Sequence, residues 1–374
     1  MTTVGYSFWG FCEKFRDCDT ANTPDGNRYG RPILVDALKN AGHDVIALQK
    51  RREKTPYENI LAYASHNHFP ALDVLLIEWR WKTYKNDGGE LSTESDWKRQ
   101  CELLDHYHGK IPIVAWDTDL KMTEEDEKRW PKMVIADPTL NPQTLTRRRQ
   151  RLTFWTDFIP LFDGPRTMFG DSGPYDTNFV KYGYVGNNYE RDDMFKRYYS
   201  DPADSLRKVG VQTNVYGNWL QRSPERESPE TIIAKYPNIA FVDRVGFNES
   251  MKILSTFICS THITKERYAK QGFVSPRYLE SIVCGTPALV PVEFLRADLL
   301  GQEWIVESSQ DIHDKVIGIK ATMESYFHGP ERCRNDIVND QKKALQEVHD
   351  FSVNSVVEMI ESFARNQTEA MKNL

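Results

Sequence analysis

The segment Ser275-Pro-Arg-Tyr-Leu-Glu-Ser-Ile-Val-Cys-Gly-Thr-Pro-Ala-Leu-Val-Pro291 is the most informative stretch of the 374-residue chain. Its Ser-Pro start predicts a helix, and its Cys-Gly-Thr-Pro turn predicts a change to an apolar strand. A helix N-terminus offers unpaired N–H groups and a positive dipole end to phosphate. Arg277 can add a bidentate phosphate contact, and Glu280 can accept both hydrogen bonds of a ribose diol. The alternative is an ordinary i,i+3 surface ion pair between these two side chains.

The same strand and helix alternation extends outward from this segment in both directions. Apolar stretches predict strands at 43–48, 73–78, 110–116, 132–136, 179–185, 213–217, 239–243, 257–259, 288–291 and 304–306. Continuous apolar strands that alternate with helices are typical of parallel sheets covered on both faces. Gly and Pro cluster near 165–178, which predicts two α/β domains joined there.

Composition narrows the class of protein. The charged residues are 48 Lys+Arg and 54 Asp+Glu, so the net charge of −6 does not by itself predict a polyanion-binding protein. No stretch of the sequence holds the roughly 18 consecutive apolar residues of a membrane span.

The N-terminus lacks a basic region and a long apolar run, so we expect no signal peptide, no membrane association and a cytoplasmic location. The six cysteines form no CxxC pair, so we expect thiols and no zinc site.

The pattern from Glu280 to the Gly-Thr-Pro turn resembles the donor-site signature of GT-B nucleotide-sugar glycosyltransferases. The resemblance implies two Rossmann-like domains that face each other across a cleft, with a C-terminal helix packing back on the N-terminal domain. Many members carry a second Glu before a Gly-Phe pair, whereas this chain has Gln271-Gly-Phe273. That departure argues against the retaining families, which rely on the pair of acids.

A closer likeness covers about residues 180–295. The segments 184–192, 214–219, 239–245 and 277–280 occur in the order found in phage DNA β-glucosyltransferases and CgeB-like glycosyltransferases. The resemblance implies that Arg191 contacts the diphosphate, Arg277 a phosphate and Glu280 the ribose. A second turn arginine of the phage enzymes falls on or beside Asn187, so that contact is missing or supplied elsewhere. The other donor-binding positions that it implies are Gly186, Gly217, Val245 and Ser275.

A carboxylate follows the predicted strand 110–116, in Asp117-Thr-Asp119. At a strand end that faces a cleft, such a group is well placed to act as a general base. Comparison with the phage enzymes points to Asp117 when the strand starts are matched, and to Asp119 when the Thr-Asp pairs are matched. We favour Asp117. The alternative is that Asp117 only caps the following turn.

Two further groups of residues are candidates for the sugar and the acceptor. The first loop offers Trp9 and Gly10 as acceptor or sugar contacts, although an aromatic such as Trp9 is more often part of the core. Asn27 and Arg28 can touch sugar or pyrophosphate, or equally only cap and order the loop. A basic run before the domain junction can meet DNA, or form a solvated face: Arg147, Arg148, Arg149 and Arg151. The resemblance implies no metal site and no cofactor, because arginines and helix ends neutralise the leaving diphosphate.

These expectations combine into one predicted function. Residues 1–168 form the acceptor-side domain, 178–335 the nucleotide-sugar domain, and 336–374 the returning C-terminal helices. The chain transfers a hexose or pentose from a nucleotide-sugar, a UDP-sugar by the resemblance, with inversion. The acceptor is a hydroxymethylated base of double-stranded phage DNA, in the cytoplasm of an infected bacterial host. Alternatives are a protein, a cell-surface glycan or a small molecule as acceptor, or a binding module without catalysis.

Overall fold

The computed structural model of the chain describes most of both halves. The structure describes residues 2–8, 27–48, 62–63, 68–81, 93–117, 119–146, 148–150, 180–188, 190–220, 227–325, 330–348, 356–363 and 365. No helix among these residues is long and apolar enough to cross a membrane.

Among the described residues, the first half forms one parallel sheet. Its strand order is β3-β2-β1-β4-β5-β6-β7, so the chain reverses direction across the sheet between β1 and β4. Such a switch point is where open α/β sheets bind ligands. The strands are β1 (Thr3–Ser7), β2 (Asp44–Ala47), β3 (Ala62–Tyr63), β4 (Val74–Glu78), β5 (Ile113–Trp116), β6 (Val134–Ala136) and β7 (Arg149–Gln150).

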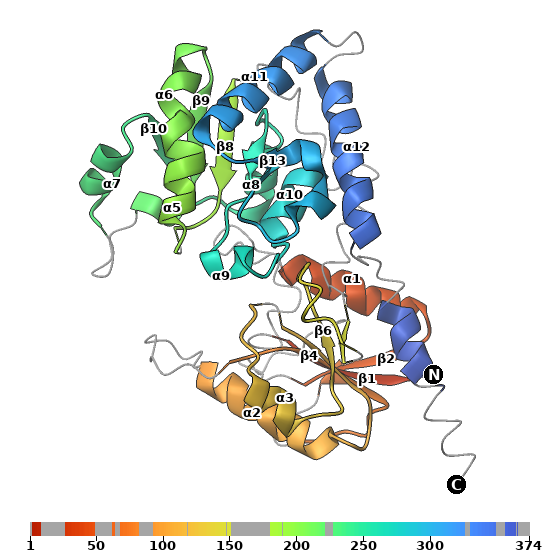
Figure 1. The fold of residues 1–374 in the computed structure, drawn as a ribbon. Coiled ribbons are helices and arrows are strands. Elements are labelled where there is room, and N and C mark those ends of the chain that lie inside the picture. Colours follow the sequence, from red (N-terminus) through yellow and green to blue (C-terminus); the bar gives the residue numbers. More distant parts are fainter. Residues whose placement is uncertain are drawn as a thin grey trace.

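Helices lie on both faces of this sheet, as the continuous apolar strands predict. Figure 1 shows α1 (Asn27–Asn40) on one face, with α2 (Thr93–Tyr107) and α3 (Glu124–Arg129) on the other. Helix α1 ends before Gly42, whose positive φ of 84° suits glycine. A capping box between Thr123 and Asp126 starts α3.

The second half repeats the same strand order. Its two sheets read β10-β9-β8 and β11-β12-β13. Hydrogen bonds from Ile258 N to Lys181 O (2.8 Å) and from Gly183 N to Cys259 O (3.4 Å) join β8 to the chain before β11. The six strands therefore follow one order, with the switch point between β8 and β11. They are β8 (Lys181–Val185), β9 (Gln212–Tyr216), β10 (Ile239–Val242), β11 (Ser260–Thr261), β12 (Ala288–Pro291) and β13 (Ile305–Val306).

Most predicted strands are present, and one is shifted. The strand expected at 257–259 occurs at Ser260–Thr261, because 258–259 bond to β8 rather than to β12. The helices around the sheet are α5 (Asp192–Phe195), the π-helical turn η4 (Lys196–Ser200), α6 (Asp201–Lys208), η5 (Asn218–Leu220), α7 (Pro229–Lys235), α8 (Phe247–Leu254), α9 (Glu266–Ala269), α10 (Pro276–Val283), η6 (Ala297–Leu300), η7 (Gln302–Trp304), α11 (Ser309–Ser325) and α12 (Pro330–Val348).

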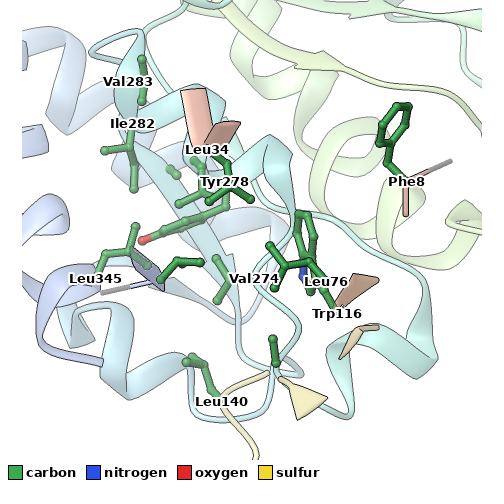
Figure 2. Close-up of a cluster of buried hydrophobic side chains, with 14 of the residues drawn as sticks. Phe8, Leu34, Leu76, Trp116, Leu140, Val274, Tyr278, Ile282, Val283 and Leu345 are labelled. Atoms are coloured by element: carbon green, nitrogen blue, oxygen red, sulfur yellow. The ribbon is translucent and has the colours of Figure 1, made fainter. Parts of the chain in front are cut away.

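One hydrophobic cluster contains residues of both halves. Figure 2 shows Leu34, Leu76 and Trp116 of the first half near Val274 and Tyr278 of the second. After α12, a helix at 356–363 returns to the first sheet, where Figure 1 shows it close to β2. Its Glu361 lies 3.7 Å from the imidazole of His43. The predicted return of the C-terminal helix is therefore present, whereas the domain boundaries near 168 and 178 lie outside the described residues and stay a prediction.

Candidate active site

The loops that follow β8 and β9 interlock at the carboxyl ends of these strands. Asn187 Oδ1 accepts a hydrogen bond from Asn218 N, and Asn218 Oδ1 accepts one from Asn188 N, each at 3.2 Å. A Cβ on Gly217, whose φ is 151°, would lie 2.2 Å from the carbonyl oxygen of Gly186. Only glycine fits such a close approach. The structure thus brings together Gly186 and Gly217, which the sequence predicts for donor binding.

Arg191 lies beside these loops, at the start of α5. Its Nη1 donates a 2.6 Å hydrogen bond to the carbonyl of Asn187, while its buried Nε has no hydrogen-bond partner among the described residues. Asn187, which stands near the position of the expected second arginine, orders the loop instead. The loop carbonyl therefore holds the guanidinium of Arg191 in place.

Helix α10 carries a buried carboxylate, Glu280, and its partner Arg277. Glu280 is only 1% exposed, and Nη1 of Arg277 donates a hydrogen bond to Glu280 Oε2. The i,i+3 pair is thus present, with its carboxylate buried and the side chain of Arg277 26% exposed. Burial of a carboxylate is costly unless a partner compensates for the lost hydration. Ser275 is the N-cap residue of α10, yet its side chain makes no capping hydrogen bond to the described helix.

His262 follows β11 and lies close to Arg277. It lines a cavity of about 10 Å³ together with Tyr184, Arg277 and Ser281. Burial lowers the pKa of His262 to about 3, so the imidazole is neutral at neutral pH. Val245, another predicted donor residue, is half-buried three residues after the end of β10.

We expect His262 to make stability depend on pH. Its pKa falls from an ordinary value of 6.5 to about 3 on folding. As the pH falls, the imidazole of His262 is protonated in the unfolded chain before it is protonated in the folded chain. The free energy of unfolding that is present above pH 6.5 is therefore lost as the pH falls towards 3. The loss approaches about 1.4 kcal/mol per pH unit. Urea unfolding of the His262→Gln variant from pH 7 downward should show a shallower loss than wild type, and parallel curves would contradict this assignment.

Asp117 directly follows β5 and faces the other half of the chain. It is 2% exposed, and its two oxygens accept hydrogen bonds from Lys121 N (2.8 Å) and Met122 N (2.9 Å). It also lines a cavity of about 510 Å³ that Arg267 and Gln271 of the second half close. Burial raises the pKa of Asp117 from 3.8 to about 6, although the two backbone N–H groups act in the opposite direction. The carboxylate thus caps the following turn and also reaches a cavity.

Asp119, the second candidate, has a different environment. Its Oδ1 accepts a 3.1 Å hydrogen bond from the hydroxyl of Tyr268, and its carbonyl accepts one from Arg267 Nη1 at 3.1 Å. Both donors belong to α9 in the second half. Asp119 therefore serves a contact between the two halves, whereas Asp117 faces the cavity.

The described part of the basic run is neutralised within the first half. Arg149, with a side chain only 16% exposed, pairs with Glu127 and with Asp137, the latter at 3.2 Å. Arg148 Nη2 donates a 3.0 Å hydrogen bond to the carbonyl of Glu127. This differs from the prediction of a free basic surface for DNA, because two acids already occupy the guanidinium of Arg149. Arg147 and Arg151 lie outside the described residues.

The side chains of the four residues predicted near the first loop are not described by the structure. Trp9 and Gly10 lie outside the described residues, and only the backbone of Asn27 and Arg28 is described, at the start of α1. Within the described ranges, no group of three or more His, Cys, Asp or Glu side chains is arranged to hold a metal ion.

A buried carboxylate that was not among the predicted site residues lies at the switch point of the first sheet. Glu78 ends β4, accepts a 2.7 Å hydrogen bond from Tyr6 Oη, and lies 3.3 Å from Arg80 Nη2. The available signal was the same as for Asp117, namely a single acid at the end of an apolar strand. Arg267 and Tyr268 were also not predicted, because nothing in the local sequence pattern indicates a role for them.

Solved structures with this architecture are known, although no protein-family model and no curated protein matches the chain. T4 phage BGT in complex with UDP-glucose superposes with a TM-score of 0.57, 14% identity and 99% coverage of both chains. An alpha-glucosyltransferase in complex with UDP-glucose and abasic DNA gives 0.58 and 13%, covering 96% of this chain and 98% of that one. Sucrose-phosphate synthase from Thermosynechococcus elongatus gives 0.50 and 11%, covering 99% and 100%. The chain therefore has the GT-B fold.

Proposed function

We propose that this protein is a glycosyltransferase that moves a sugar from a UDP-sugar to a hydroxyl group of an acceptor. The observation that carries the proposal is the placement of Arg191 and the Arg277–Glu280 pair, whose carboxylate is buried, near the carboxyl ends of strands of the second sheet, while Asp117 faces a cavity closed by that half. Two of the similar structures were solved with UDP-glucose, which supports the choice of donor.

The donor side supplies positive charge for the leaving group. Arg191 and Arg277, with the N-terminus of α10, stabilise the negative charge that develops on the diphosphate as the glycosidic bond breaks. Glu280 engages Arg277 through Oε2, so its Oε1 accepts the hydrogen bonds of the ribose hydroxyls. The ion pair thus orients the carboxylate as well as neutralising it.

The acceptor side supplies the base. Asp117 takes the proton of the acceptor hydroxyl while that oxygen attacks the anomeric carbon, and the UDP leaves with the electrons of the broken C–O bond. Attack from the face opposite the diphosphate inverts the anomeric centre. Asp117 suits this role better than Asp119 because it lines the cavity, whereas the carboxylate of Asp119 accepts the hydroxyl of Tyr268 where the two halves meet.

The raised pKa of Asp117 predicts the pH dependence of turnover. The base must be ionised, so kcat should be constant above the pKa of about 6 and fall below it. The fall should approach about tenfold per pH unit for a single protonation. Initial rates at saturating donor between pH 4.5 and 8 measure this acid limb. A profile that stays flat through pH 6 would contradict a role for Asp117 as base.

For the acceptor, we infer a hydroxymethylated base in DNA. Support comes from the similar structures, one of which is described as a DNA modifying enzyme and another of which contains DNA. The pairing of Arg149 with Glu127 and Asp137 favours the second candidate, a protein, glycan or small-molecule acceptor, because it removes a cation from any DNA-binding surface.

A donor and acceptor screen tests both parts of this proposal. UDP release from several UDP-sugars is followed with a duplex that contains hydroxymethylcytosine, with the same duplex unmodified, and with no DNA. One T4 phage BGT structure was solved with UDP and Mn²⁺, so each reaction is run with and without Mn²⁺. We expect release only with the modified duplex, and it should weaken steeply with salt. Equal release with unmodified DNA would exclude the DNA acceptor, and lack of binding to any UDP-sugar would exclude the activity.

A further inference from the structure

The segment from Lys265 to Phe273 contacts both sides of the proposed active site. Lys265 Nζ donates a 3.2 Å hydrogen bond to Glu190, the residue before Arg191. Tyr268 donates its hydroxyl to Asp119, two residues after Asp117. One short segment therefore contacts the neighbours of the donor arginine and of the base.

The end of this segment also makes backbone contacts with the first half of the chain. Leu140 N donates to the carbonyl of Gly272 at 2.8 Å, and Thr139 and Phe273 form an antiparallel bridge. Gly272 has a φ of 63°, and a Cβ there would lie 2.6 Å from the carbonyl oxygen of Leu295. The backbone is thus held in one conformation where the two halves meet.

Arg267 in turn holds the ring of Tyr268. Its guanidinium carbon lies 4.2 Å from the ring centroid, and its Nη2 donates a 2.8 Å hydrogen bond to the Tyr268 hydroxyl oxygen. The tyrosine is buried, so its hydroxyl has little freedom to choose another acceptor. This arrangement aims the hydroxyl proton at Asp119.

We propose that Tyr268 is a positioning residue, which sets the geometry of the turn that carries Asp117 by donating its hydroxyl to Asp119. The proposal rests on the proposed function. Asp117 is held by the N–H groups of Lys121 and Met122, so the turn that contains Asp119 also orients the catalytic carboxylate. A misplacement of about 1 Å in such a group can reduce the rate by about 10²-fold.

Removal of the hydroxyl alone tests this role. In Tyr268→Phe, kcat should fall by about 10- to 10²-fold, while the Kd for UDP-glucose stays unchanged because the donor residues are intact. The acid limb of the pH profile should also move to higher pH, since the charge of Asp119 is then less compensated and opposes ionisation of Asp117. A merely structural role would leave the pH profile in place.

Variants of the acceptor of this hydrogen bond complete the test. Asp119→Asn keeps an oxygen for the tyrosine hydroxyl and should retain most of kcat, whereas Asp119→Leu should lower kcat as much as Tyr268→Phe does. The double variant Tyr268→Phe with Asp119→Leu should be no slower than either single variant, because both remove the same interaction. Tyr107→Phe is the matched control, since it removes a hydroxyl that donates to Pro70 O at 2.5 Å away from the site.

The outcomes separate this inference from the proposed function. If wild type transfers sugar and Tyr268→Phe has the same kcat and pH profile, the positioning role is wrong while the function stands. If wild type transfers no sugar, the function is wrong, and carbon-13 NMR titration of Asp117 in both proteins still decides the positioning role. An unchanged Asp117 pKa in Tyr268→Phe would then overturn it.

Discussion

Replacement of Asp117 by Asn should lower kcat by about 10²–10⁴-fold, the usual contribution of a positioned general base. The amide keeps the shape of the carboxylate but cannot accept a proton from the acceptor hydroxyl. UDP-glucose should bind as it does to wild type, because Arg191, Arg277 and Glu280 belong to the other half of the chain. Single-turnover rates and calorimetric titration with UDP-glucose measure the two effects separately.

Asp119→Asn is the internal control, since its amide oxygen can still accept the hydroxyl of Tyr268. It should cost much less than Asp117→Asn. If the two effects are reversed, the base is Asp119. If neither substitution matters, the carboxylate of Asp117 only caps its turn, and the base lies elsewhere in the first half. Glu78, the buried acid at the end of β4, would then be the next candidate.

Loss of the buried ion pair should have the largest effect on donor binding. Glu280→Ala removes the ribose acceptor and leaves Arg277 without its partner, so UDP-glucose should bind about 10- to 100-fold more weakly, or about 1–3 kcal/mol. Arg277→Ala should weaken UDP as well as UDP-glucose, since it removes a phosphate contact. Calorimetric titrations of both variants with UDP and UDP-glucose measure these changes.

The stability of these variants needs its own measurement. Arg277→Ala leaves the carboxylate of Glu280 buried and unpaired, which costs about 3–5 kcal/mol in comparable pairs. Glu280→Gln keeps the shape of the side chain and shows whether weak binding follows from the lost charge or from unfolding. Asp204→Ala is the matched control, because Asp204 pairs with Arg207 at i,i+3 on α6 but is exposed. If both site variants bind UDP as wild type does, the donor site is placed wrongly.

Local patterns in the sequence were sufficient to predict most helices and strands. Helix α10 begins after Ser275 and ends before Gly285, whose φ is 71°, as the Ser-Pro start and the glycine predict. Such signals depend on neighbouring residues alone, because capping, backbone freedom and apolar periodicity act over a few positions. The position of Asp117 at a strand end follows from the same local pattern.

Contacts between distant residues were decided by the tertiary structure. Arg149 pairs with Glu127, 22 positions earlier, so a run of basic residues that reads as an exposed surface is partly neutralised. Asp119 and Tyr268 lie 149 positions apart, and no local pattern predicts that they meet.

The sequence by itself determined the α/β class, the start of α10 with its Arg277–Glu280 spacing, and the acid that follows β5. Only the tertiary structure decided that Glu280 is buried, that Asp117 faces a cavity, and that α9 contacts Asp119. The physical reason is that burial and the pKa shifts that follow from it depend on what covers a side chain. The residues that cover a side chain come from distant segments of the chain, and the local sequence does not show which segments these are.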